Sequence, residues 1–291
     1  MGKLRIMDKK TERVVFPQLG NWVVEMANQS ERLSIRNSAD MIKQGLSLLE
    51  VIPDEHSWHF ISDVTMENIL SNSRQTKSSA HELNRVYWGD VISNWQAYSL
   101  TTYWRGVELI QPAIRTLNLK ELIAAAVLAR ALLELSANFL NNSRVLKKFI
   151  EDIPDLKTNN VASQKFEYFI NKALWGTKSI DKHNPLFQVS AVDAIRTLSD
   201  FPQAEELLPT YKYLCEVAHP NFAGNARFWS HIEDINEDGS ENRVISRFSN
   251  TESAKELIEN TLWALAWGSV AMENSFKMSF SALDVLVKKL D

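Results

Sequence analysis

The sequence predicts an all-α fold: a multi-helix bundle around a buried central helix at residues 118–150, with one short β-hairpin near residues 226–248. Two observations predict the bundle: apolar residues recur at helical spacing along most of the chain, and one stretch is apolar on every face. A third predicts the hairpin, because Asp238-Gly239 lies between segments rich in β-branched and aromatic residues. Helices packed on helices around one core follow from this pattern.

The central helix is predicted from a stretch with high helix propensity. Residues 118–150 contain six alanines and a run of leucines, without Gly or Pro. A helix that is apolar all round has to be enclosed by other helices or by lipid. Arg130 and Glu134 are the only charges within residues 124–140, and their spacing places them on one face. We expect them to be largely buried and paired, because an isolated charge there is costly.

A polar stretch divides the chain into parts. Residues 71–79 read Ser-Asn-Ser-Arg-Gln-Thr-Lys-Ser-Ser, a composition typical of a linker. The division gives a flexible basic arm at residues 1–17, an N-terminal helical segment at residues 18–70 and a main helical domain at residues 80–291.

Within the N-terminal segment, apolar spacing predicts two helices between residues 18 and 50, with a break near residues 34–37. Pro53 ends this region, and a short helix follows at residues 63–70. In the main domain, residues 80–117 form an aromatic-rich helical pattern that Pro112 should bend or break.

Further helices are predicted after the central one. Gly176 is a natural C-cap for the first, and Pro220 ends the third at His219. Asn250 is the predicted N-cap of the last helix, which continues to Lys289. The expected helices cover residues 161–175, 189–198, 203–218 and 251–289.

Composition excludes several classes of protein. The chain has 291 residues and a formal net charge of −4, without a basic block that would mark a nucleic-acid footprint. Cys215 is the single cysteine, which excludes an internal disulfide and fits a reducing compartment. Residues 122–140 are long enough to span a membrane, but each of their two central charges would cost roughly 2.5–3.5 kcal/mol there. With no secretory signal at the N-terminus, we expect a cytoplasmic protein that does not enter a membrane.

Motifs for metals and cofactors are incomplete. Glu216-x-x-His219 is one half of a di-iron site of helical bundles, and the second half is missing from the chain. His56 and His59 have metal-compatible spacing but no evident third ligand. Gly-rich phosphate loops, Gly-x-Ser-x-Gly and Cys-x-x-Cys are absent. The sequence therefore predicts neither a metal nor a cofactor.

Five residues form a candidate polar pocket: Arg130, Glu134, Glu216, His219 and Asn221. If their helices pack side by side, the pocket has either a structural or a chemical interpretation. In the structural one, Arg130 pairs with Glu134 or Glu216, and His219 interacts with unpaired carbonyls at the helix end. In the chemical one, His219 is a general acid or base and Arg130 holds a phosphate.

Two segments carry a resemblance to a known family. Ala-Arg-Ala-Leu-Leu-Glu at residues 129–134, followed by Tyr-Lys-Tyr-Leu-Cys-Glu-Val-Ala-His-Pro-Asn at residues 211–221, resembles a group of bacterial helical proteins. That group is similar in layout to the HEPN superfamily, and the resemblance covers residues 119–224. It implies a HEPN-like helical core. Many HEPN members are metal-independent ribonucleases of toxin–antitoxin or phage-defence systems.

The chain departs from the HEPN motif at one position. The motif places an arginine, and then a polar residue, four to six residues before a histidine. Here Leu214 and Tyr213 lie five and six residues before His219. Arg130 would have to supply the arginine from another helix, or the chain is a non-catalytic relative.

Three classes of function remain open. The first is an interaction or regulatory protein, with a protein partner or self-association favoured over a small molecule. The second is a ribonuclease or nucleotide-handling enzyme, with RNA as the partner. The third is a ligand-binding module with a groove lined by Trp88, Trp95 and Trp104. A basic rim around His219 would favour RNA, and an exposed apolar patch would favour a protein partner.

Overall fold

The computed structural model describes residues 17–75, 80–154, 156, 164–177, 179–181, 183–184, 186–187, 190–199, 205–219, 222–246 and 251–291. Helices dominate these residues, which confirms the all-α fold class, and the sheet they contain is one two-stranded hairpin. Residues 1–16 of the predicted basic arm lie outside the described residues, as do Asn221 and Asn250.

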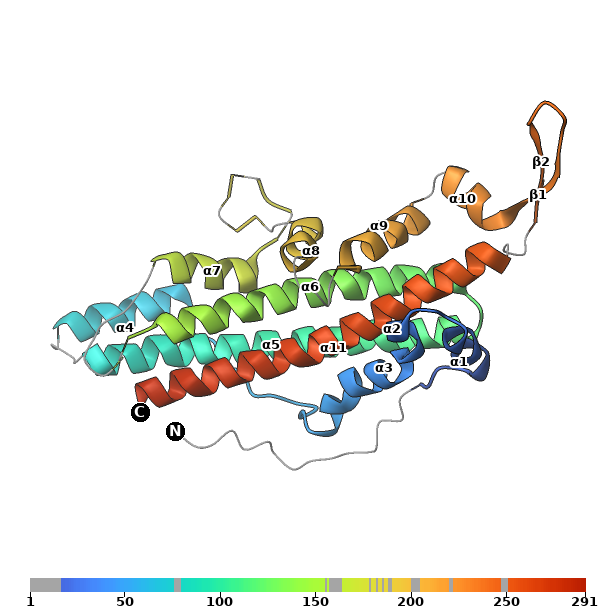
Figure 1. The fold of residues 1–291 in the computed structure, drawn as a ribbon. Coiled ribbons are helices and arrows are strands. Elements are labelled where there is room, and N and C mark those ends of the chain that lie inside the picture. Colours follow the sequence, from blue (N-terminus) through green and yellow to red (C-terminus); the bar gives the residue numbers. More distant parts are fainter. Residues whose placement is uncertain are drawn as a thin grey trace.

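Three long helices run side by side along the molecule: α5 (Ala80–Asn118), α6 (Leu122–Asp152) and α11 (Thr251–Leu290) (Figure 1). A turn with Lys120 at φ 62° joins α5 to α6. The helices approach closely where a Cβ on Gly268 of α11 would lie 2.8 Å from Leu132 Cγ of α6. The core therefore lies between these three helices.

The central helix is α6, and it is covered on most but not all sides. It packs against α5 and α11, and α8 (Ala191–Ser199) and α9 (Leu207–Ala218) cover its other side. Ala124 and Val127, in its N-terminal half, remain exposed, which corrects the prediction of a helix enclosed all round. Length and composition alone would let α6 cross a membrane, and α6 is the one helix among the described residues for which this holds.

The N-terminal segment packs along α11. It forms α1 (Asn21–Asn28), α2 (Leu33–Arg36), α3 (Ser38–Leu46) and the 3₁₀ turn η1 (Ser47–Glu50). The break falls at residues 29–32, so the prediction of a break at residues 34–37 was wrong for Ser34 to Arg36, which are helical. Ile35 explains the difference, because its side chain is completely buried in the core and holds this turn in place.

Two predicted interruptions are helical in the structure. Helix α4 (Asp63–Gln75) continues through the first five residues of the predicted linker, and residues 76–79 lie outside the described part of the chain. Helix α5 continues through Pro112 without a break. Its neighbours Ile110, Ala113 and Ile114 are buried, and their packing outweighs the one hydrogen bond that a proline cannot make.

Helices α7 (Gln164–Trp175), α8 and α9 lie on the α6 side of the molecule, opposite to α1, α2 and α3 (Figure 1). Helix α7 ends as predicted, where the Gly176 N–H donates to the Lys172 carbonyl at 3.1 Å. Helix α9 also ends as predicted, with His219 in an extended conformation before Pro220.

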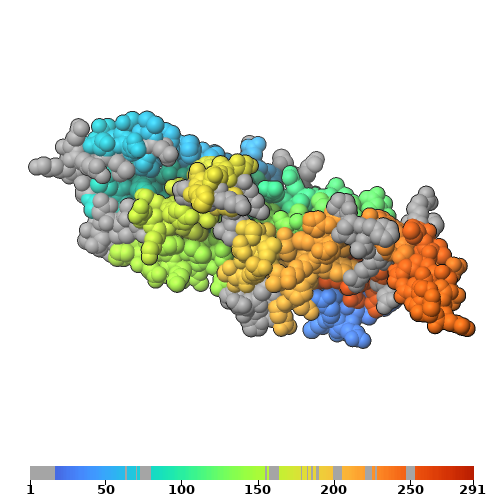
Figure 2. Space-filling view, turned by 90° about the horizontal axis from the view of Figure 1, so that it is seen from above, coloured from blue at the N-terminus to red at the C-terminus, as the bar shows by residue number. Residues whose placement is uncertain are grey.

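A hairpin projects from one end of the elongated molecule (Figures 1 and 2). Helix α10 (Phe222–Trp229) precedes it, so residues 226–229 are helical and the predicted hairpin boundary was wrong there. Strand β1 (Ser230–Ile235) pairs antiparallel with β2 (Glu241–Ile245). The predicted Asp238-Gly239 turn joins them, with Gly239 at φ 81°.

Candidate functional site

Arg130 and Glu134 meet as predicted, and Tyr211 joins them. The Arg130 Nη2 lies 3.1 Å from Glu134 Oε1. The Tyr211 hydroxyl donates to the same Oε1 at 2.8 Å, and the Arg130 guanidinium lies 5.8 Å from the Tyr211 ring centroid. The network therefore links α6 to α9.

The ion pair is less buried than we expected. The side chains of Arg130 and Glu134 are 30% and 31% exposed. They lie near the edge where α9 crosses α6, so solvent reaches both groups. An ion pair in this position is screened by water and salt, and contributes less to stability than a buried one.

Electrostatics fix the protonation of this network. Burial, the hydrogen bond to Glu134 and the neighbouring Cys215 together raise the pKa of Tyr211 above its ordinary value. Burial alone would lower the pKa of Arg130, but contact with Tyr211 and the interactions with Cys215 and Glu134 outweigh it and raise that pKa. At neutral pH, Tyr211 keeps its proton and Arg130 keeps its charge. The network is therefore suited to bracing two helices rather than to transferring protons.

Glu216 and His219 lie apart from this network. Glu216 comes five residues after Tyr211, about 140° around the helix, and is exposed. His219 lies roughly 12 Å further along the α9 axis than Tyr211. Its backbone N–H donates to the carbonyls of Cys215 and Glu216, while its side chain is exposed and makes no hydrogen bond or ion pair with any described residue. Two of the five candidate residues are thus brought together, and Asn221 lies outside the described residues.

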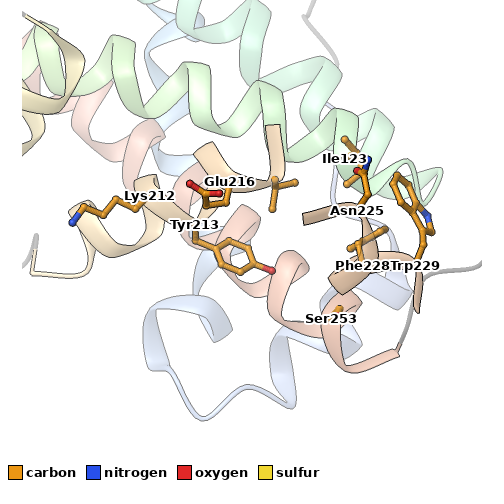
Figure 3. Close-up of a pocket in the computed structure, with 9 residues that line it drawn as sticks. Ile123, Lys212, Tyr213, Glu216, Asn225, Phe228, Trp229 and Ser253 are labelled. Carbon is orange, nitrogen blue, oxygen red and sulfur yellow. The ribbon is translucent and has the colours of Figure 1, made fainter. Parts of the chain in front are cut away.

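Glu216 instead lines an apolar cleft (Figure 3). The cleft lies between α9, α10 and the N-terminal ends of α6 and α11, and its volume is about 280 Å³. The Tyr213 hydroxyl points toward the α10 side of the cleft, whereas the Lys212 ammonium points away from it (Figure 3). Its apolar lining comes from Ile123, Val217, Phe228 and Trp229, and its polar lining includes Glu216 and Asn225.

The chemistry of the cleft is mainly apolar. Apolar side chains dominate its lining, and His219 is not among the lining residues. No group of three His, Cys, Asp or Glu residues that could hold a metal occurs in the part of the chain that the structure describes. Sequence reasoning missed Phe228 and Trp229 because we assigned residues 226–229 to the hairpin.

The most deeply buried carboxylate of the described residues was also missed. Glu273 of α11 is buried, accepts a hydrogen bond from Gln44 Nε2 at 2.9 Å and lies 2.6 Å from Lys277 Nζ. It joins α3 to α11 and has a structural role. The i,i+4 spacing of Glu273 and Lys277 was the available signal.

The aromatic residues of α5 do not form an open groove. Trp88 and Trp95 are buried in the core, where Trp95 Nε1 donates to Ser279 Oγ at 3.1 Å. Two of the three tryptophans that were predicted to line a ligand-binding groove are therefore inaccessible to a ligand.

Comparison of the chain with family models, with curated proteins and with solved structures finds no match in any of the three.

Proposed function

We propose that this protein is an interaction protein that binds another protein through the end of the molecule that carries the cleft and the hairpin. The observation that carries the proposal is the apolar cleft between α6, α9, α10 and α11. Exposed apolar surface of this kind, rimmed by polar groups, is typical of protein-binding sites.

The size of the cleft favours side chains of a partner over a small-molecule ligand. Ligand pockets usually measure about 300–1,000 Å³, and this cleft falls just below that range at about 280 Å³. It has room for one or two apolar side chains. Trp229, which lines it, is the kind of residue that dominates binding energy at protein interfaces.

The experiment is site-specific photo-crosslinking in the cells that make the protein. A photoreactive phenylalanine replaces Asn225, an exposed residue at the cleft, and in a control replaces Glu151, exposed at the far end of α6. We expect a discrete protein adduct from position 225 that position 151 does not give. In an Ile123→Glu background, which puts a carboxylate into the apolar lining, we expect the adduct to disappear.

Other outcomes count against the proposal. An RNA adduct at position 225 would favour the nuclease hypothesis. Equal protein adducts at positions 225 and 151, or no protein adduct at 225, would contradict a binding site at the cleft.

A further inference from the structure

The register of the hairpin next to the cleft gathers isoleucines on one face, together with Arg243 and Glu241, which form an ion pair with each other. Ile232 and Ile235 are three residues apart, so a regular strand would place them on opposite faces. Ile232 pairs with Arg243 and Ile235 pairs with Glu241, and the register shift between Ile232 and Asp234 accommodates one extra residue. Since Arg243 and Glu241 are two apart on β2, they share a face, and both isoleucines lie on it.

Ile245 completes this face. It lies two residues beyond Arg243 on β2 and pairs with Ser230. The three side chains of this isoleucine face, Ile232, Ile235 and Ile245, are 43%, 62% and 72% exposed. The sheet has two strands in the described part of the chain, and a two-stranded hairpin alone buries too little to be stable in water.

Several hydrogen bonds nevertheless define the turn of the hairpin. The Asn236 N–H donates to the Ser240 carbonyl at 2.8 Å, and the Asp238 carboxylate accepts from the Ser240 backbone and hydroxyl at 2.9 and 2.6 Å. At the other end, the Ser246 N–H donates to the Trp229 carbonyl at 2.8 Å, directly beside the cleft. These hydrogen bonds close the turn and join the base of the hairpin to Trp229, the last residue of α10.

Charge decides which partner fits this face. Residues 230–246 carry five carboxylates and one arginine, a net charge of −4 with His231 neutral. The whole chain also has a net charge of −4, so the remaining residues balance, with 31 basic and 31 acidic side chains. The net negative charge of the protein is therefore concentrated in the hairpin.

This charge disfavours three occupants. Nucleic acids and anionic lipid surfaces carry phosphate charges of the same sign. A second copy of the chain would bring its own −4 against the first. A basic partner gains from the same field, both in the rate of encounter and in orientation.

We infer that the isoleucine face of the hairpin is the docking surface for a basic protein segment that carries apolar side chains between its lysines or arginines. The inference rests on the proposed function and names its partner class. The segment lays its apolar side chains on the three isoleucines, and the field of the five carboxylates of residues 230–246 attracts its cations.

The test measures binding of short fluorescent peptides to the full chain by anisotropy. The probe alternates lysine and valine, one comparison peptide alternates glutamate and valine, and another alternates lysine and serine. We expect saturable binding of the lysine–valine peptide and at least about tenfold weaker binding of the other two.

Matched variants locate the binding site. Ile232→Ser with Ile245→Ser should weaken the lysine–valine peptide about tenfold or more, whereas Val64→Ser, an exposed apolar residue of α4, should leave it unchanged. Glu233→Lys with Glu237→Lys should also weaken it, whereas Glu31→Lys with Glu55→Lys, which adds the same charge at exposed sites elsewhere, should have a smaller effect. The charge variants leave the isoleucines intact and test the inference without altering the apolar face.

Several results would overturn the inference. The inference of a basic partner is wrong if the lysine–valine and glutamate–valine peptides bind with equal affinity. It is also wrong if the lysine–valine peptide binds the isoleucine variant as tightly as the wild-type protein. If sedimentation shows dimers that Ile245→Ser dissociates, the isoleucine face binds a second copy of the chain. If poly-uridine RNA or phosphatidylserine vesicles bind and the isoleucine variant abolishes this binding, the face binds RNA or a membrane instead. If the peptide fails while a cleft adduct forms at position 225, the proposed function stands and this inference falls.

Discussion

At the scale of single residues, Tyr211 makes the Arg130–Glu134 pair asymmetric. Glu134 pairs with the Arg130 guanidinium and also accepts a hydrogen bond from the Tyr211 hydroxyl, whereas Arg130 forms one ion pair among the described residues, with Glu134. Glu134→Leu removes both the ion-pair partner of Arg130 and the hydrogen-bond acceptor of Tyr211, and we expect it to lower the free energy of unfolding by about 1–3 kcal/mol. Arg130→Met leaves the hydrogen bond from Tyr211 intact, and we expect a loss of about 1 kcal/mol or less because the pair is partly exposed. Urea titration of both variants measures the difference.

The double variant tests whether the two residues act together. Once Glu134 is absent, removing Arg130 also removes an unpaired charge, so Arg130→Met with Glu134→Leu should be no less stable than Glu134→Leu alone. Losses that simply add would show that the two side chains do not interact in solution.

Substitution of His219 tests the nuclease hypothesis with little effect on folding. Its side chain is exposed and lacks polar partners among the described residues, so His219→Ala should change the free energy of unfolding by no more than about 0.5 kcal/mol. Any RNA cleavage by the wild-type protein that this variant loses would then reflect chemistry and not folding. We expect neither protein to cleave a fluorescent single-stranded RNA, because Arg130 lies with Tyr211 and not with His219.

At the scale of elements, the contact between α3 and α11 requires a residue without a side chain at position 45. A Cβ on Gly45 would lie 2.4 Å from the backbone carbon of Ser269, and backbone atoms cannot move aside by changing rotamer. We expect Gly45→Ala to lower the free energy of unfolding by about 1–3 kcal/mol. Thermal unfolding followed by circular dichroism measures the loss.

Gly89 of α5 provides the matched control. Nothing lies within 4 Å of a Cβ at this position, so Gly89→Ala should raise stability by about 0.5–1 kcal/mol through its helix propensity. Equal effects of the two substitutions would mean that the close approach of α3 to α11 does not exist in solution.

The elements that sequence reasoning found were those whose signals are local. The long helices α5, α6 and α11 have uninterrupted periodicity, and Asp238-Gly239 fixes a turn by itself. The elements that it missed depend on packing across the molecule. The break through residues 34–36 and the effect of Pro112 were misjudged because the burial of Ile35 and Ile114 outweighs local preference.

The same distinction applies to the candidate site. The i,i+4 pairing of Arg130 and Glu134 is a local property and was predictable, but their exposure depends on where α9 crosses α6. Tyr211 entered the network from another helix, which no spacing along the chain indicates. The isoleucine face depends on a bulge, and a one-residue shift in register reverses which face each side chain occupies.

At the scale of the whole molecule, two clusters of buried side chains share the long helices. One includes Tyr103, Leu132 and Leu262 and extends under α1 to α3, and the other includes Trp88, Trp95 and Leu146 and extends under α7. Tyr98 packs against both clusters. Since α5, α6 and α11 run through both, we regard the body of the protein as one cooperative unit, with the hairpin as its projecting part.

Buried tyrosines in this unit determine how stability changes at alkaline pH. Burial is the largest cause that raises the pKa of Tyr87, Tyr98, Tyr103 and Tyr211. A raised pKa means that the folded protein holds the phenolic proton to higher pH than the unfolded chain does, whose pKa is about 10. The stabilisation is fully present below pH 10 and is lost progressively as pH rises above it. We expect urea midpoints that fall steeply between about pH 10 and pH 11.5.

Tyr103→Phe separates this effect from other alkaline changes. It removes the hydrogen bond to the Gly45 carbonyl, made at 2.7 Å, and so should lower the free energy of unfolding at pH 7 by about 1 kcal/mol. It also removes one titrating group, so the loss of stability above pH 10 should be smaller than in the wild type. Tyr168→Phe, which removes the hydroxyl of an exposed ring outside the core, is the matched control. A Tyr103→Phe protein with the wild-type slope above pH 10 would mean that the loss of the Tyr103 proton does not unfold the core.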